Sequence, residues 1–361
     1  MKEKISTRQL AVITAVGFTV TKLHALPAIL AGMAGESLWI AAAINLLADF
    51  ILLCAALKIT AKYPDCDLFG AVKNEIGKIP AQIIFVTYAV YFLVKSIVPI
   101  AEQKNSIELT FYETQPTVIT FMPFFFVAFY IVIKGCLSFA RSMEICLWLF
   151  IAGMAITILL SAFSGNYARL LPIIPTDPIK TAKAAYSTLF WFGDPLYVAF
   201  FCGKIKRDKN HDKRVIGSYL IYCALVIVLL VVFYAVFGSI AQRQYYATLK
   251  MSKYAVSLSD IGRFDFIAAL LLAGTTVYQV TLPLAFASEC LNCAFALKRR
   301  FVAPTVIISV SACLTLIVQN DFFRAVDFMQ SYASYFFIVL CYILPVLFAV
   351  FTRRKNDIQK G

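Results

Sequence analysis

Apolar stretches long enough to cross a lipid bilayer recur along this chain from residue 10 to residue 351, with only short polar breaks between them. A bilayer core about 30 Å thick is crossed by about 20 residues of α-helix. Lipid offers backbone groups no hydrogen-bond partners, so such stretches must satisfy their own backbone as helices. The sequence therefore predicts an all-α polytopic membrane protein.

We expect about ten transmembrane helices in a single transmembrane domain over residues 1–361. The predicted spans are residues 10–33, 38–57, 81–102, 118–133, 145–163, 184–202, 216–240, 266–297, 302–318 and 332–351. The first apolar stretch is longer than the roughly 7 to 15 apolar residues of a signal peptide, so it is assigned as the first span. Two loops, residues 67–76 and 242–257, are predicted to hold short surface helices.

Charge placement indicates the topology. Only 15% of the residues are charged, although the formal net charge is +13. With the N-terminus inside, 22 of the 33 Lys and Arg residues fall on the cytoplasmic side and nine on the other. This asymmetry follows the positive-inside rule, places both termini in the cytoplasm and accounts for the basic charge without nucleic acid as a partner.

The sequence contains none of the common catalytic motifs that were sought. The chain contains two histidines and no HExxH, GxSxG or GxxxxGK sequence. A single CxxC pair, Cys290 and Cys293, lies in an apolar helix without a second pair, where free thiols act as small hydrophobes. We therefore expect no catalysis, no cofactor and no metal, and any transport to be driven by ion or substrate gradients.

The ten spans divide into two halves, residues 7–163 and 182–351, with five helices each. Because five is odd, the second half enters the membrane from the opposite side. This is the 5+5 inverted repeat common among secondary transporters.

The first helix of each half is expected to be broken. Pro27 interrupts the first span, and Gly193 with Pro195 interrupts the sixth, because proline removes a backbone donor and glycine tolerates non-helical angles. Paired broken helices in corresponding positions point to a transporter binding site, where freed amides and carbonyls bind a carboxylate and an ammonium group. The alternative is a pair of ordinary proline kinks with a structural ion pair.

Four ionisable residues stand out within the predicted spans, at or near mid-depth: Lys22, Asp49, Lys95 and Asp194. A charge in the bilayer is costly unless it is paired or hydrated, so these residues are candidates for a functional site. The predicted ligand site comprises Thr21, Lys22, Leu23, Tyr91, Lys95, Phe192, Gly193, Asp194, Thr275 and Tyr278.

We expect Lys22 and Asp194 to form an ion pair across the two breaks, with Lys22 in the space of a coupling cation. Asp49 and Lys95 are the alternative partners. His24, beside the first break, is expected to be a packing residue more than a proton relay.

Several short motifs, taken in order, resemble the B-subunit permeases of spore germination receptors, a branch of the amino acid, polyamine and organocation transporter superfamily. The motifs are Ile5-Ser6 with Arg8-Gln9-Leu10, Leu26-Pro27, Gly35-Glu36 with Trp39, Lys134-Gly135, Ala140-Arg141 with Glu144, Leu170-Leu171-Pro172, and Phe192-Gly193-Asp194. They cover roughly residues 5–215. The chain departs from the family pattern at Lys22, where small residues are usual, at Trp191, and at Asp194, where the family usually has glutamate.

The resemblance implies a leucine-transporter-like fold with a ligand site between helices one, three, six and eight. It further implies a subunit that senses small amino-acid germinants in the spore inner membrane, in a complex with A and C subunits. Two other classes stay open: a stand-alone secondary amino-acid transporter, and a membrane scaffold whose pocket is empty.

Overall fold

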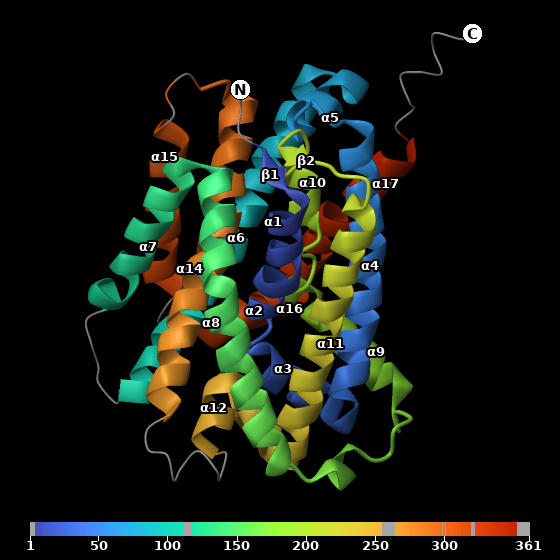
Figure 1. The fold of residues 1–361 in the computed structure, drawn as a ribbon, viewed down its shortest axis with the longest axis vertical. Helices are drawn as coiled ribbons and strands as arrows, with labels where there is room; N and C mark the ends of the chain where they lie inside the picture. Colours follow the sequence, from blue (N-terminus) through green and yellow to red (C-terminus); the bar gives the residue numbers. More distant parts are fainter. Residues whose placement is uncertain are drawn as a thin grey trace.

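The computed structural model describes residues 4–111, 117–254, 264–297, 299, 301–318 and 322–351, which form an elongated bundle of helices (Figure 1). The elements of the first half are β1 (Ile5–Ser6), α1 (Thr7–Val12), η1 (Ile13–Gly17), α2 (Phe18–Val20), α3 (Leu26–Ala34), η2 (Gly35–Ser37), α4 (Leu38–Lys62), α5 (Leu68–Ile76), α6 (Lys78–Phe111), α7 (Thr117–Lys134) and α8 (Cys136–Phe163). Those of the second half are η3 (Tyr167–Leu170), α9 (Pro178–Thr188), η4 (Leu189–Trp191), α10 (Leu196–Phe200), β2 (Ile205–Lys206), α11 (His211–Phe237), η5 (Gly238–Arg243), α12 (Ala247–Tyr254), α14 (Phe264–Phe295), α15 (Val302–Val318), α16 (Phe322–Ile338), η7 (Val339–Ile343) and α17 (Leu344–Phe351).

Each predicted span coincides, within the described residues, with one of these helices or with shorter helices in succession. By length and hydropathy, four helical stretches are able to cross a bilayer, namely Leu26–Lys62, Lys78–Gln103, His211–Arg243 and Ser334–Phe351, and a fifth if the bent pair Cys136–Cys146 and Phe150–Phe163 is one span. Three shorter apolar helices are Thr7–Val20, Met122–Lys134 and Val302–Val318. The first and sixth spans are interrupted, as predicted, whereas the eighth is the continuous helix α14.

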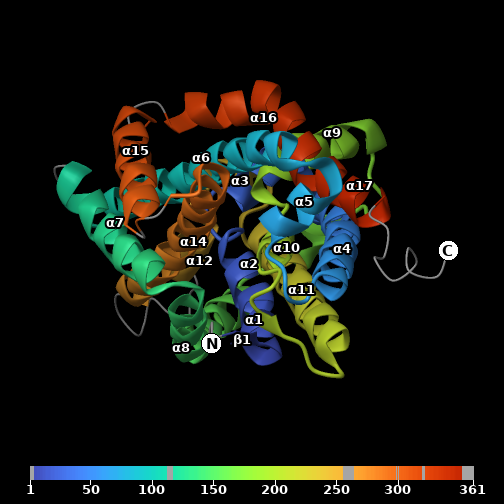
Figure 2. The same ribbon diagram turned by 90° about the horizontal axis from the view of Figure 1, so that it is seen from above.

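Two helices begin earlier than hydropathy indicates. The third and fifth spans were predicted to begin at residues 81 and 145, whereas α6 begins at Lys78 and α8 at Cys136. These helices extend into polar residues beyond the apolar span, because the backbone forms helical hydrogen bonds regardless of side-chain polarity. Helix α16 also differs, since it lies across the bundle instead of alongside its neighbours (Figure 2).

Both predicted short helices are present, but only α5 lies at the surface, since most of α12, including Leu249 and Met251, is buried. The Asp67 side chain caps α5 by accepting from the backbone of Gly70, and Gly77 ends the helix with φ +92°. The second is α12, which lies within the predicted 242–257 stretch; residues 255–257 fall outside the described part of the chain.

A short parallel pairing joins the beginning of the first half to the loop after the sixth span. Ile5 of β1 lies opposite Ile205 of β2, and the Ile5 amide donates to the Lys204 carbonyl over 2.8 Å. The Ser6 hydroxyl and the Gln9 side chain then form a capping box that begins α1. In Figure 1 this pairing and α17 lie at the same end of the bundle, as an even number of crossings requires.

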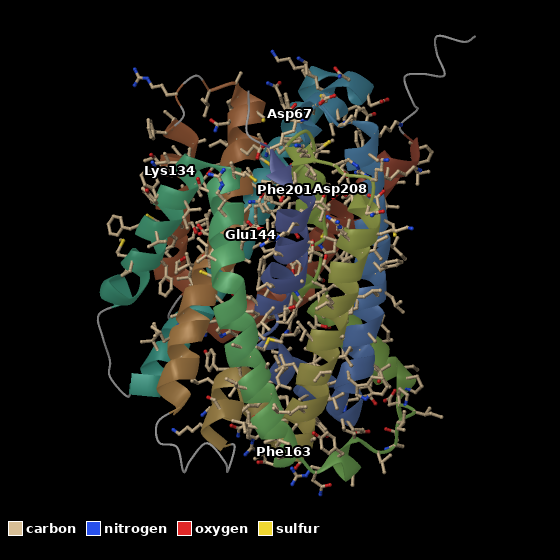
Figure 3. The ribbon with its side chains drawn as sticks, viewed as in Figure 1. Asp67, Lys134, Glu144, Phe163, Phe201 and Asp208 are labelled. Carbon is tan, nitrogen blue, oxygen red and sulfur yellow. The ribbon has the colours of Figure 1, made fainter. Side chains whose placement is uncertain are left out.

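Large apolar side chains face outward along the bundle. Leu47, Ile51 and Ile83 are at least 60% exposed on α4 and α6. Such a surface suits lipid and would aggregate in water. Asp67 and Phe163 mark the two opposite ends of the bundle (Figure 3).

Two segments have π-helical turns, η1 in the first span and η7 in the last. Hydropathy gives no signal for them, because a π turn changes the backbone hydrogen-bond pattern and not the composition. Such turns recur at functional sites.

Candidate ligand site between the broken helices

The first helix is interrupted at residues 21–25, which lie between α2 and α3 without helical structure. Pro27 does not kink a continuous helix; it stands in the first turn of α3. An absent backbone donor costs nothing there, because the first amides of a helix have no partner inside it. The break therefore leaves the residues from Thr21 to Ala25 with backbone groups for other partners.

The sixth helix is interrupted at residues 192–195, between η4 and α10. Gly193 has φ +82°, which L side chains rarely adopt, and a Cβ atom there would collide with the Cys341 sulfur. Pro195 precedes α10 as its N-cap residue. Glycine is thus required for two reasons, the backbone angle and the close approach of η7.

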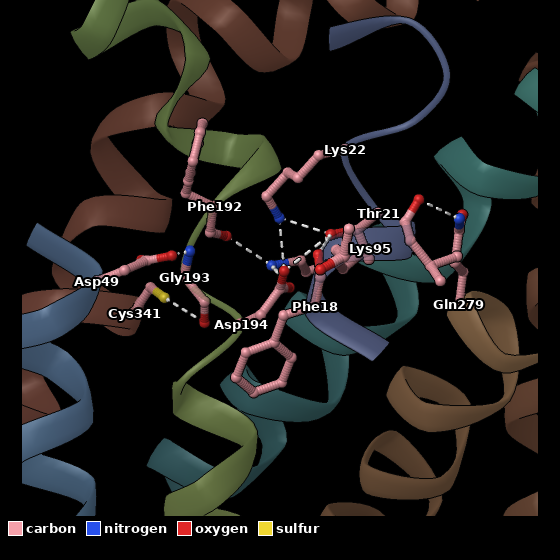
Figure 4. Close-up of polar contacts among 12 residues, drawn as sticks. Phe18, Thr21, Lys22, Asp49, Lys95, Phe192, Gly193, Asp194, Gln279 and Cys341 are labelled. Atoms are coloured by element: carbon pink, nitrogen blue, oxygen red, sulfur yellow. Dashed lines mark hydrogen bonds and ion pairs between the residues drawn. The ribbon is translucent and has the colours of Figure 1, made fainter. Parts of the chain in front are cut away.

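Asp194 binds two lysines at the point where the breaks meet (Figure 4). Lys22 Nζ lies 2.6 Å from its Oδ2 atom, and Lys95 Nζ lies 2.9 Å from its Oδ1 atom. The Thr21 hydroxyl donates to the same Oδ2 atom over 2.9 Å. All three charged side chains are at most 8% exposed. The predicted Lys22–Asp194 pair is present, and Lys95 is a second partner instead of an alternative one.

Backbone groups freed by the sixth-helix break are bound by side chains. Lys95 Nζ donates to the Phe192 carbonyl over 2.7 Å, and the Gly193 amide donates to Asp49 Oδ1 over 2.8 Å. Asp49 also accepts from the Tyr342 hydroxyl over 2.8 Å. Among the described residues no cation lies within ion-pair distance of Asp49. Two lysines and two aspartates thus share one buried region.

A second buried polar group lies at the first break. The Glu102 carboxylate, on α6, lies beside the Trp191 indole and the backbone of Ala25, at the N-terminus of α3. A carboxylate is stabilised there by the unpaired amides and the helix dipole. Both ring nitrogens of His24 are buried without a hydrogen-bond partner among the described residues. Glu102 is the last residue of the predicted third span and is not among the predicted site residues.

The structure brings six of the ten predicted site residues together: Thr21, Lys22, Lys95, Phe192, Gly193 and Asp194. The other four lie around or away from this cluster. Leu23 is buried beside it and its carbonyl accepts from Thr248, and Tyr91 lies against Cys341 of η7. Thr275 is buried in α14.

Tyr278 points to another part of the bundle. Its hydroxyl lies 2.9 Å from the Cys146 sulfur, and its ring packs edge-on against Phe139. The contact of α14 with the first break comes from Gln279, which donates to the Val20 carbonyl over 2.7 Å. A shift of one residue turns a helix by about 100°, so adjacent residues serve different neighbours.

Comparison with known proteins identifies the family. A family model described as spore germination protein matches residues 4–323. The chain belongs to the spore germination protein family. A comparison with curated protein sequences gave no match.

This chain shares its fold with solved transporters. The spore germination chain superposes on MhsT in complex with L-phenylalanine with a TM-score of 0.65 at 14% identity, over 94% of this chain and 86% of that one. It superposes equally well on a manganese transporter of Eremococcus coleocola in complex with an aromatic bis-isothiourea compound, with a TM-score of 0.65 at 14% identity, over 94% and 78%. The leucine-transporter-like fold with broken first and sixth helices is confirmed. Family and fold together make this spore germination protein an integral membrane permease, a non-enzymatic class.

Proposed function

We propose that this chain is the permease subunit of a germinant receptor, which binds a small amino-acid-like germinant between the broken helices and signals or conducts when occupied. The observation that carries the proposal is the buried Asp194 cluster at the junction of the two breaks. Buried charge in a membrane bundle is retained at ligand and ion sites because it is costly elsewhere. The family assignment supports the receptor role.

The cluster suggests how a zwitterion would be held. Lys22 and Lys95 both neutralise Asp194, so the region carries no free cation for an incoming carboxylate unless a lysine changes partner. A ligand carboxylate binding Lys22 would release part of Asp194 for the ligand ammonium. Because ion pairs are exchanged and not lost, binding avoids leaving a buried charge uncompensated. Lys22 takes the place of a coupling cation in this scheme.

A stand-alone secondary amino-acid transporter is the second candidate. It is favoured by the transporters that share the fold, one of which is solved with L-phenylalanine. Uptake of the ligand by the purified protein alone in liposomes would support it. A requirement for A and C subunits, the former with a large soluble domain and the latter a lipoprotein, would support the receptor.

The site is tested by thermal unfolding of the purified protein with a panel of amino acids. A ligand that binds only the folded state stabilises it by about 2.7 kcal/mol at 100 times its dissociation constant. We expect at least one amino acid to raise the unfolding temperature of the wild type, and Asp194→Asn to remove that effect. No shift with any member of the panel would contradict a ligand site at the breaks.

We also propose the location and orientation. The protein lies in the spore inner membrane with both termini in the cytoplasm, and its inverted repeats cover approximately residues 7–163 and 182–351. The support is the distribution of Lys and Arg residues and the common position of β1 and α17 at one end (Figure 1).

A further inference from the structure

A cavity of about 250 Å³ lies between α7, α8, α14 and α15, away from the broken helices. Its lining includes Phe201 and Lys204, just after α10, and Glu289 on α14. Figure 3 shows Phe201 in the half of the bundle nearest Asp67, the end predicted to be cytoplasmic. None of the four charged residues of the central cluster lines it. The cavity is therefore separate from the proposed germinant site.

One ion pair provides all the charge of the lining. Lys204 Nζ pairs with Glu289 Oε2, and the two side chains are 26% and 30% exposed, so both remain accessible. Burial lowers the pKa of Lys204 and the Glu289 carboxylate raises it, and the balance leaves this pKa above its usual value. Lys204 is thus a cation, and the lining has no net charge. A ligand with a net charge would leave one charge unmatched, whereas a zwitterion matches both.

A free acceptor lies beside the pair. Asn292 is three residues after Glu289 on the same face of α14, and its Oδ1 atom is buried without a partner in the described part of the chain. A buried acceptor without a donor costs about 1 to 3 kcal/mol, which a ligand donor would recover. An ammonium group has three donors, and Glu289 and Asn292 together offer acceptors for them.

The rest of the lining is apolar and aromatic. Phe139, Phe201 and Phe286 contribute rings, and Lys204 Nζ lies 5.4 Å from the centre of the Phe286 ring. Aromatic faces favour both an apolar side chain and a nearby cation. The cavity therefore combines a charged pair at one place with an apolar compartment beside it.

We propose that this cavity is a second ligand site, which binds a small zwitterion with an apolar side chain. The anionic group of the ligand pairs with Lys204, and its primary ammonium pairs with Glu289 and Asn292. Two ion pairs thereby replace one. A free neutral amino acid and an aminophospholipid headgroup both present this chemistry.

Lys204 links the cavity to the N-terminal segment of the chain. The Lys204 carbonyl accepts from the Ile5 amide, so the residue that would bind the ligand also holds β1 against β2. Phe201 packs edge-on against Phe286 at 5.1 Å. A ligand that fixes the Lys204 side chain would restrain the loop that joins α10 to α11.

The test uses Cys136, which lines the cavity, as the reporter. A variant that retains only this cysteine of the ten is labelled with a methanethiosulfonate reagent in detergent. We expect saturating L-leucine to slow labelling at least fivefold, and neither isoamylamine nor 4-methylpentanoate, which each have only one of the two charges, to do so. A matching variant that retains only Cys54, which is exposed on α4 and outside the cavity, should label at the same rate with and without leucine.

Substitutions separate this site from the central one. Glu289→Gln and Asn292→Leu should each remove the protection, and Asp208→Asn, which breaks the Arg214 ion pair at the same end of the bundle, should retain it. Lys22→Met, which changes the central cluster and leaves Asp194 paired with Lys95, should also retain it. Loss of protection in Lys22→Met alone would mean that labelling reports the central site, and would overturn the proposal while leaving the germinant site intact.

The two sources of ligand are distinguished in nanodiscs. Protection of Cys136 by phosphatidylethanolamine discs, without leucine and with phosphatidylglycerol discs as the comparison, would identify a lipid headgroup as the occupant. Protection by leucine in both kinds of disc would identify a free amino acid. Protection by neither leucine nor phosphatidylethanolamine would overturn the proposal.

Discussion

Replacing Asp194 by asparagine would leave two buried lysines without their shared anion. Lys22 and Lys95 lie 2.6 and 2.9 Å from Asp194, and all three side chains are at most 8% exposed. Removing one member of a buried ion pair typically costs about 3 to 5 kcal/mol, because the remaining charge is uncompensated. Since one substitution here leaves two such charges, we expect a loss near the upper end, about 5 kcal/mol.

Lys22→Met should cost much less. Asp194 retains Lys95 in this variant, so the loss is that of one charged hydrogen bond, about 2 kcal/mol. The double variant leaves only Lys95 unpaired, at a cost of about 4 kcal/mol. The single effects sum to about 7 kcal/mol, so the expected coupling energy is about 3 kcal/mol, at the upper end of measured values for residues in contact.

Equilibrium unfolding in mixed detergent micelles gives the four free energies of this cycle. The exposed Arg214–Asp208 pair, with side chains 57% and 42% exposed, is a suitable control, since pairs of this kind couple by about 1 kcal/mol or less. If the Lys22→Met and Asp194→Asn effects add within about 0.5 kcal/mol, the two residues do not interact, and Lys22 does not serve as a cation surrogate.

Three further outcomes are expected. Gly193→Ala should destabilise the fold by about 1 to 3 kcal/mol, because the alanine would have a positive φ and its Cβ atom would contact the Cys341 sulfur. Adding Cys341→Ala should recover part of this loss in the same unfolding assay. If stability does not recover, the contact with Cys341 is not the cause. A cysteine placed at Lys209 should react with an impermeant maleimide only in inside-out vesicles, and labelling from the outside would reverse the orientation. Gln279→Leu should cost about 1 to 3 kcal/mol in the same unfolding assay because the Val20 carbonyl loses its donor, and an unchanged stability would remove this contact from the account of the first break.

The fold was predictable because its determinants are local in the sequence. Hydropathy locates the helices, since lipid selects apolar runs of a fixed length. Pro27 and the Gly193-Asp194-Pro195 segment mark the breaks, since the backbone cannot remain helical there. The charged cluster was predictable for a related reason, because Lys22 and Asp194 are too costly to leave unpaired in a membrane.

The arrangement around the cluster depends on how helices face each other, which this sequence does not encode locally. α14 is apolar nearly all round, so it has no amphipathic pattern to show that Gln279 faces the first break while Tyr278 faces α8. Glu102 was not predicted as a site residue, because it is the last residue of the third apolar span. The two lysines on Asp194 come from helices far apart in sequence, so composition alone gives the number of charges but not their pairing.

The π-helical segment η7 sets which side chains reach the sixth-helix break. A π turn holds one more residue than an α turn, so it rotates everything after it by about 100° relative to a regular helix. In the present register Tyr342 donates to Asp49, and the Cys341 sulfur lies 3.4 Å from the Gly193 carbonyl. Rewinding η7 into α geometry would swing both side chains out of these contacts while every helical backbone bond is re-formed. The π-helical register of the last span thus determines the contacts of both the Gly193 carbonyl and Asp49.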